Sequence, residues 1–142
     1  MVKNSILELM IKDHKKIVEI LDELEKDGYP NFEAFCRFKW HLEKHIFIEE
    51  KAIFIYYHKR NDNESNIYEK LSNEHTVILD LLDKILKDSF PKGNINFNKL
   101  KHLLSNHKKF EEKNIYPQLD KEVSDFEKSK IIKKIMEIIK TV

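Results

Sequence analysis

The sequence predicts an all-α fold, an up-down-up-down four-helix bundle with a short C-terminal fifth helix. Its 142 residues include only two glycines and three prolines, too few turn residues for a β-sandwich or a β-barrel. Apolar residues recur at helical spacing through four long segments. The few glycines and prolines fall mostly between those segments, and long helices joined by short loops pack as antiparallel neighbours.

Each segment begins with residues that favour a helix start. We expect the four long helices over roughly 5–27, 31–60, 65–89 and 96–116. Ser5 has a glutamate three positions later, which is the capping-box pattern, and Asn31 and Asn96 are N-cap residue types that follow turns. The fifth helix is expected to begin at Ser124, which starts a second capping box.

Composition excludes several functional classes. The charges nearly cancel, 26 basic against 25 acidic residues, so no nucleic-acid partner is indicated. No apolar run approaches the roughly 18–20 residues of a membrane span. A single cysteine, Cys36, allows no internal disulfide and no cysteine-rich metal site. We therefore expect a soluble cytoplasmic protein in which histidines and carboxylates hold any metal.

The two halves of the chain contain the same pattern. An acidic residue precedes a histidine on one helix, and the next helix carries a histidine followed by two glutamates four and five positions later. The pattern occurs at Asp13, His14, His45, Glu49 and Glu50, and again at Glu74, His75, His107, Glu111 and Glu112. We interpret residues 1–142 as one domain with an internal repeat, roughly 13–57 and 74–120.

The repeated histidines should point into the core. His14, His45, His75 and His107 all have apolar neighbours three, four and seven positions away. Glu49 and Glu111 lie about one turn after a histidine and share its inward face. Ionised core glutamates need compensating charge. A metal ion held by imidazole and carboxylate would supply it, whereas a metal-free core would leave these groups structural.

These motifs, followed by Ile115-Tyr116-Pro117, resemble the hemerythrin-like (HHE cation-binding) domain family over roughly residues 5–120. The resemblance implies a four-helix bundle around a non-haem di-iron centre with two bridging carboxylates and an oxo or hydroxo bridge. Four histidines would then be terminal ligands and two glutamates the bridges, namely His14, His45, His75, His107, Glu49 and Glu111. Imidazole and carboxylate also suit Mn, Zn or Ni, so iron rests on the resemblance.

Two positions depart from the family's oxygen carriers. Those carriers have a second histidine one turn after the third-helix ligand, where this chain has Leu79. They take the fourth-helix carboxylate from an aspartate five residues after its histidine, where this chain has Glu112. The repeat favours Glu111 as the bridge, with Glu112 as the alternative. Such ligation leaves one open position on each iron, which resembles the di-iron domain of iron–sulfur-cluster repair proteins.

Other residues near the motifs have less defined roles. His41 lies one turn before His45 and is a fifth ligand, a hydrogen-bond partner of a ligand, or a bystander in the core. His58 and His102 are expected at the surface. Tyr116 is the aromatic residue best placed to serve the site, because it lies one turn beyond Glu112.

Three functions follow from this interpretation. The first is binding of O2 or another small diatomic ligand for transport, storage or sensing. The second is iron–sulfur-cluster repair or a response to nitric oxide or peroxide. The third is iron sensing or a metal-free interaction bundle. No zinc-protease or serine-hydrolase motif is present, so we favour a binding protein over an enzyme.

Overall fold

The computed structural model describes residues 5–26, 32–55, 62–89 and 97–140, and within them it is all-helical, with no strand. Two helices form each half of the chain, and two further helices follow them. The helices are α1 (Ile6–Lys26), α2 (Phe32–Ile48), α4 (Asp62–Ser89), α5 (Asn98–Phe110), α6 (Tyr116–Glu122) and α7 (Asp125–Ile139). The turns expected between residues 27 and 31 and between residues 89 and 96, the predicted caps Asn31 and Asn96, and His58 lie outside the described residues.

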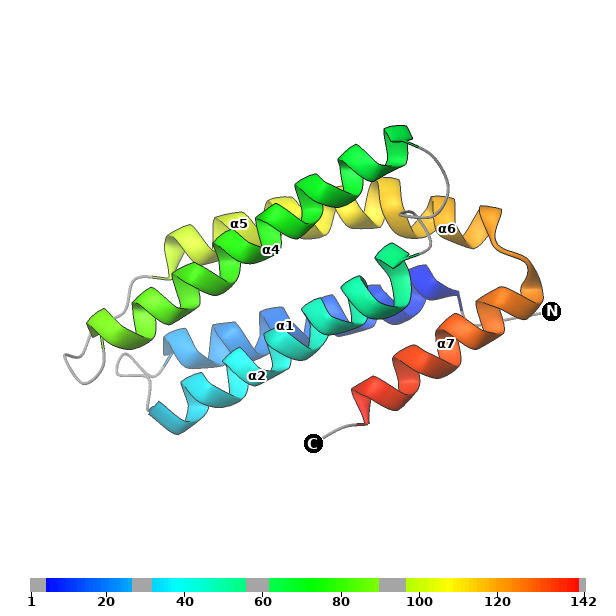
Figure 1. Ribbon diagram of the computed structural model, residues 1–142. Coiled ribbons are helices and arrows are strands. Elements are labelled where there is room, and N and C mark those ends of the chain that lie inside the picture. Colours follow the sequence, from blue (N-terminus) through cyan, green and yellow to red (C-terminus); the bar gives the residue numbers. More distant parts are fainter. Residues whose placement is uncertain (1–4, 27–31, 56–61, 90–96, 141–142) are drawn as a thin grey trace.

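The long helices run in alternating directions (Figure 1). Helix α1 lies alongside α2, α4 lies alongside α5, and α2 also contacts α4. Helix α7 folds back along α2 (Figure 1). None of the described helices is long and apolar enough to cross a membrane.

The predicted N-caps are present at both ends of the chain. The hydroxyl of Ser5 accepts a hydrogen bond from the backbone N–H of Glu8 (3.0 Å), and that of Ser124 accepts one from Glu127 (3.2 Å). The carboxylate of Asp120, on α6, accepts further bonds from the first two N–H groups of α1 (3.0 and 3.1 Å). This contact satisfies backbone donors that α1 cannot satisfy itself and ties α6 to its start.

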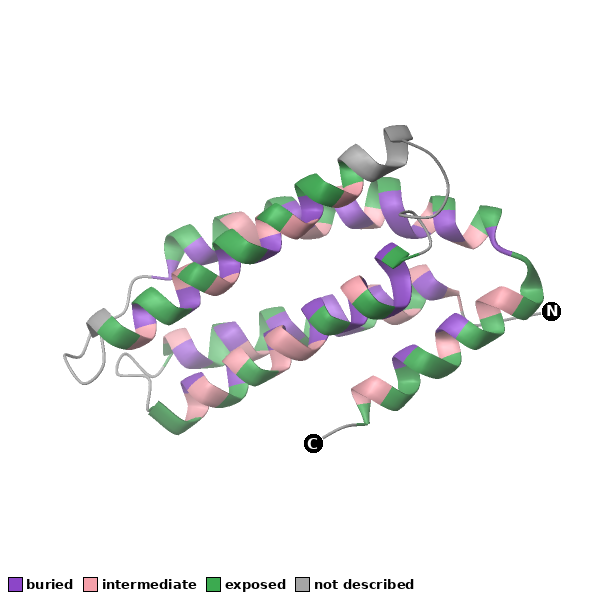
Figure 2. Ribbon diagram, viewed as in Figure 1, coloured by how far each residue is buried: buried purple, intermediate pink, exposed green. Residues whose placement is uncertain are grey.

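Two apolar clusters lie along the molecule, with the helices' buried faces turned inward (Figure 2). One includes Met10, Phe54 and Tyr116, and the other includes Phe38 and Leu82. In the described part of the chain, the buried polar or charged side chains are Asp13, His14, His45, Glu49, His75, His107 and Glu111. All of them belong to the repeated motifs. These charged and titratable groups are therefore held away from water.

Candidate metal centre

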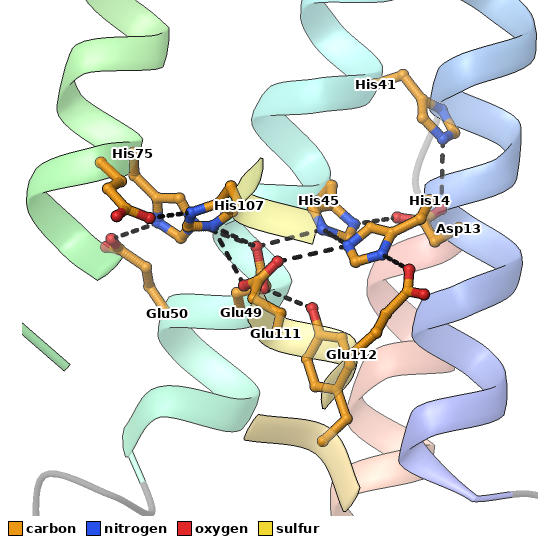
Figure 3. A network of polar contacts seen from close by, with 12 residues as sticks. Asp13, His14, His41, His45, Glu49, Glu50, His75, His107, Glu111 and Glu112 are labelled. Carbon is orange, nitrogen blue, oxygen red and sulfur yellow. Dashed lines mark hydrogen bonds and ion pairs between the residues drawn. The ribbon is translucent and has the colours of Figure 1, made fainter. Parts of the chain in front are cut away.

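Four helices each contribute one histidine to a common centre. The residues are His14 on α1, His45 on α2, His75 on α4 and His107 on α5, and none is more than 7% exposed. The predicted inward orientation of all four is therefore confirmed. Figure 3 shows their rings facing one another in two pairs.

The Nε2 atoms meet within each pair. His14 and His45 bring their Nε2 atoms to 3.0 Å, and His75 and His107 do the same, also at 3.0 Å. The ring centroids are 4.6 Å apart in the first pair and 4.7 Å in the second. The two halves of the repeat thus build the same local geometry.

Two fully buried glutamates lie between the histidine pairs. Glu49 Oε1 is 3.2 Å from His45 Nε2 and 3.1 Å from His75 Nε2. The oxygens of Glu111 are 3.5 Å from His14 Nε2 and 3.2 Å from His107 Nε2. Each carboxylate therefore approaches one histidine of each pair (Figure 3).

Both glutamates begin a π turn, which the sequence did not predict. Turns η1 (Glu49–Ile53) and η2 (Glu111–Ile115) continue α2 and α5 directly. A turn closed by i+5 hydrogen bonds holds more residues than an α-helical turn, so consecutive side chains diverge by less than about 100°. Glu49 and Glu50 can then reach histidines from the same turn. Such turns are frequent at functional sites.

The other ring nitrogen of each histidine faces a carboxylate. Nδ1 pairs with an oxygen 2.5–3.0 Å away in all four cases, and the partners are Asp13 for His45, Glu74 for His107, Glu50 for His75 and Glu112 for His14. A carboxylate can only accept from Nδ1–H, which fixes the tautomer and leaves the Nε2 lone pair aimed at the centre. Sequence analysis did not assign these roles, although all four acids belong to the repeated pattern.

The remaining predicted residues lie around this arrangement. Glu112 contacts the outer nitrogen of His14 and is 26% exposed, whereas Glu111 faces inward. His41 Nε2 lies 3.3 Å from Asp13 Oδ1, so it reaches a partner of His45 and not the centre. His102 is exposed, as expected, and contacts Asn106.

Tyr116 introduces a difference between the two glutamates. Its buried hydroxyl donates a hydrogen bond to Glu49 Oε2 (2.6 Å). The repeat-equivalent residue, Phe54, stacks on His75 with ring centroids 5.5 Å apart and has no hydroxyl to donate. Among the described residues, neither oxygen of Glu111 has a hydrogen-bond partner. Glu49 is therefore fixed by a donor that Glu111 lacks.

The two histidines of each pair differ in their pKa values. Burial disfavours charge on His45, but the carboxylates of Glu49 and Asp13 outweigh it and raise its pKa to about 10. Burial and the charge of His45 lower the pKa of His14 to about 4. The pKa of His75 is likewise raised and that of His107 lowered. In each pair, therefore, one imidazole has a raised pKa and the other a lowered pKa.

The donor set fits two metal ions. One group of possible ligands consists of His14, His45, Glu49 and Glu111, and the other of His75, His107, Glu49 and Glu111. Within each group the ligand atoms all lie within 4.8 Å of one another. Neighbouring ligands on an octahedral ion with bonds of about 2.1 Å lie about 3.0 Å apart, which matches the spacing within each pair. A cation would also compensate Glu111, a buried carboxylate without a hydrogen-bond donor. Imidazole and carboxylate suit Fe, Mn, Zn or Ni.

Comparison with known proteins identifies a family that is consistent with a metal-binding centre. No curated protein and no solved structure shows a significant match to the chain. Residues 5–119 match the family model described as the hemerythrin HHE cation-binding domain. This match spans both halves of the repeat and every histidine and glutamate of the centre. The chain therefore belongs to the hemerythrin HHE cation-binding domain family.

Proposed function

We propose that the chain is a non-haem di-iron protein with an up-down-up-down four-helix bundle, formed as one domain. The terminal ligands are His14, His45, His75 and His107, the bridging ligands are Glu49 and Glu111, and an oxo or hydroxo group completes the bridge. The observation that carries this proposal is the pair of donor groups that share both glutamates. Family membership supports metal binding, and it favours iron among the metals that suit this donor set.

The proposed activity is binding of O2 or another small diatomic ligand for transport, storage or sensing. A pair of ferrous ions supplies the electrons that such a ligand accepts when it binds. The chain's own groups prepare the site for this: the outer carboxylates orient the imidazoles, and aliphatic side chains line the space next to the centre. Tyr116 holds Glu49 in position through its hydroxyl.

A second candidate is iron–sulfur-cluster repair or a response to nitric oxide or peroxide. Position 79 favours it, because the oxygen carriers of the family have a histidine there and this chain has a partly buried leucine. With four histidines, each ion keeps an open position. That symmetry suits a reactive centre as well as a reversible carrier.

One experiment separates these candidates. The protein is loaded anaerobically with ferrous iron, iron is counted per chain, and the visible spectrum is followed through cycles of oxygenation and deoxygenation. Two irons with a reversible charge-transfer band support diatomic binding. Rapid, irreversible oxidation to the ferric state supports the second candidate. Absence of stoichiometric iron would refute both.

Variants test the ligand assignment. His45→Ala and Glu111→Ala should lose iron, whereas His102→Ala, which removes an exposed histidine, should keep two ions per chain. Leu79→His restores the histidine of the oxygen carriers and should lengthen the lifetime of any O2 adduct. Unchanged iron content in the first two variants would contradict the assignment.

A further inference from the structure

A cavity of about 270 Å³ adjoins the metal centre. Its inner end is lined by the four histidines and two glutamates of the centre. Its walls are aliphatic and come from all four long helices: Ile17, Leu21, Leu42, Ile46, Ile78 and Leu104. A water-sized molecule takes up about 30 Å³ in the liquid. The cavity is therefore several times larger than a diatomic ligand requires.

The outer end of the cavity is polar and opens between α1 and α5. Asp22 lies on the α1 side, and Lys101 and Lys108 lie on the α5 side. Val18, which also lines the cavity, is 40% exposed. The cavity thus runs from solvent, past two lysines and an aliphatic wall, to the metal-binding side chains.

We propose that this cavity binds the alkyl chain of a short monocarboxylate, with the carboxylate group at the two metal ions. The inference rests on the proposed di-metal function. A carboxylate offers two oxygens to a centre with one open position on each ion, and the two cations favour a negative charge. The cavity volume includes the space of the bound ions. At about 30 Å³ for each ion or non-hydrogen atom the cavity holds about nine, so two ions and a bridging oxygen leave room for about six, the size of butyrate, and the last carbons of hexanoate would lie at the mouth.

A series of acids of increasing length tests the proposal. The protein is loaded anaerobically with two ferrous ions per chain, and acetate, butyrate and hexanoate are titrated into it by calorimetry. Burial of one methylene contributes about 0.8 kcal/mol, or about fourfold in affinity. Butyrate should therefore bind about 15-fold more tightly than acetate, and hexanoate more tightly than butyrate.

Two adjacent leucines provide matched variants. Leu104 and Leu103 are both half-buried on α5 and pack against the same apolar cluster, but only Leu104 lines this cavity. Leu103 lines a separate cavity beside Glu74 and His107. Leu104→Phe should abolish most of the gain from acetate to hexanoate while acetate affinity stays the same. Leu103→Phe should preserve the gain.

Metal analysis separates failure of this inference from failure of the proposed function. If no metal is bound by the wild-type protein, the proposed function fails and the inference fails with it. If two ions bind but affinity does not rise with chain length, or if both leucine variants behave alike, the inference alone is overturned. Should Leu104→Phe not retain metal, Val18→Phe at the mouth is the variant to compare.

Discussion

The hydroxyl of Tyr116 should contribute measurably to the stability of the metal-free protein. Tyr116→Phe removes the donor 2.6 Å from Glu49 Oε2 and leaves that oxygen buried without its partner. A hydrogen bond to a charged group contributes about 1.5–3 kcal/mol. The substitution leaves the ring in place, so little of the loss comes from packing. With an m-value of about 2 kcal/mol/M, the urea midpoint should fall by about 0.7–1.5 M.

The measurement is urea unfolding of the metal-free protein, followed by circular dichroism. Tyr68→Phe is the comparison variant, because Tyr68 is half-buried and its hydroxyl is hydrogen-bonded to Ser72 and not to a buried carboxylate; its loss should be smaller, about 0.5–1.5 kcal/mol. The reverse change, Phe54→Tyr, gives the equivalent position a hydroxyl. If Tyr116→Phe and Tyr68→Phe shift the midpoint equally, the hydrogen bond to Glu49 does not stabilise the fold.

Three further substitutions test other parts of the structure. Glu111→Gln removes a buried charge that has no hydrogen-bond donor, so urea unfolding of the metal-free protein should show no loss of stability while metal content falls below two ions per chain. Asp13→Asn weakens the acceptor for His45 Nδ1 and should lower metal affinity about 10–100-fold in a chelator competition; an unchanged affinity would count against this role. Ser124→Ala removes the N-cap of α7 and should cost about 1 kcal/mol, seen as a melting temperature a few degrees lower.

The inward-facing residues of the centre were predictable because their geometry is local. A histidine and a glutamate four positions later share a helix face whatever the helix packs against. His45 with Glu49, and His107 with Glu111, follow this rule, and the structure buries all four side chains. The N-cap at Ser124 is local in the same sense and is also present.

The contacts that cross between helices were not predictable in this way. Glu50 lies next to Glu49 in the chain, yet its partner is His75 on α4. Asp120 caps α1 from the far end of the sequence. Such pairs depend on the relative rotation of whole helices, and here also on the π turns that bring neighbouring glutamates to different histidines. The relative rotation of the helices cannot be deduced from the spacing of residues in a single sequence.

The repeat predicts that the two halves contribute equivalent residues to the centre, but two positions next to the centre differ between the halves. Position 116 is tyrosine where its equivalent is Phe54, and its hydroxyl holds Glu49. Position 41 is histidine where its equivalent is Leu103, and its Nε2 lies 3.3 Å from Asp13 Oδ1, next to the partner of His45. The Tyr116 hydroxyl thus fixes Glu49, while Glu111 has no hydrogen-bond donor among the described residues. We therefore expect Glu111, and not Glu49, to be the carboxylate that moves when a ligand binds.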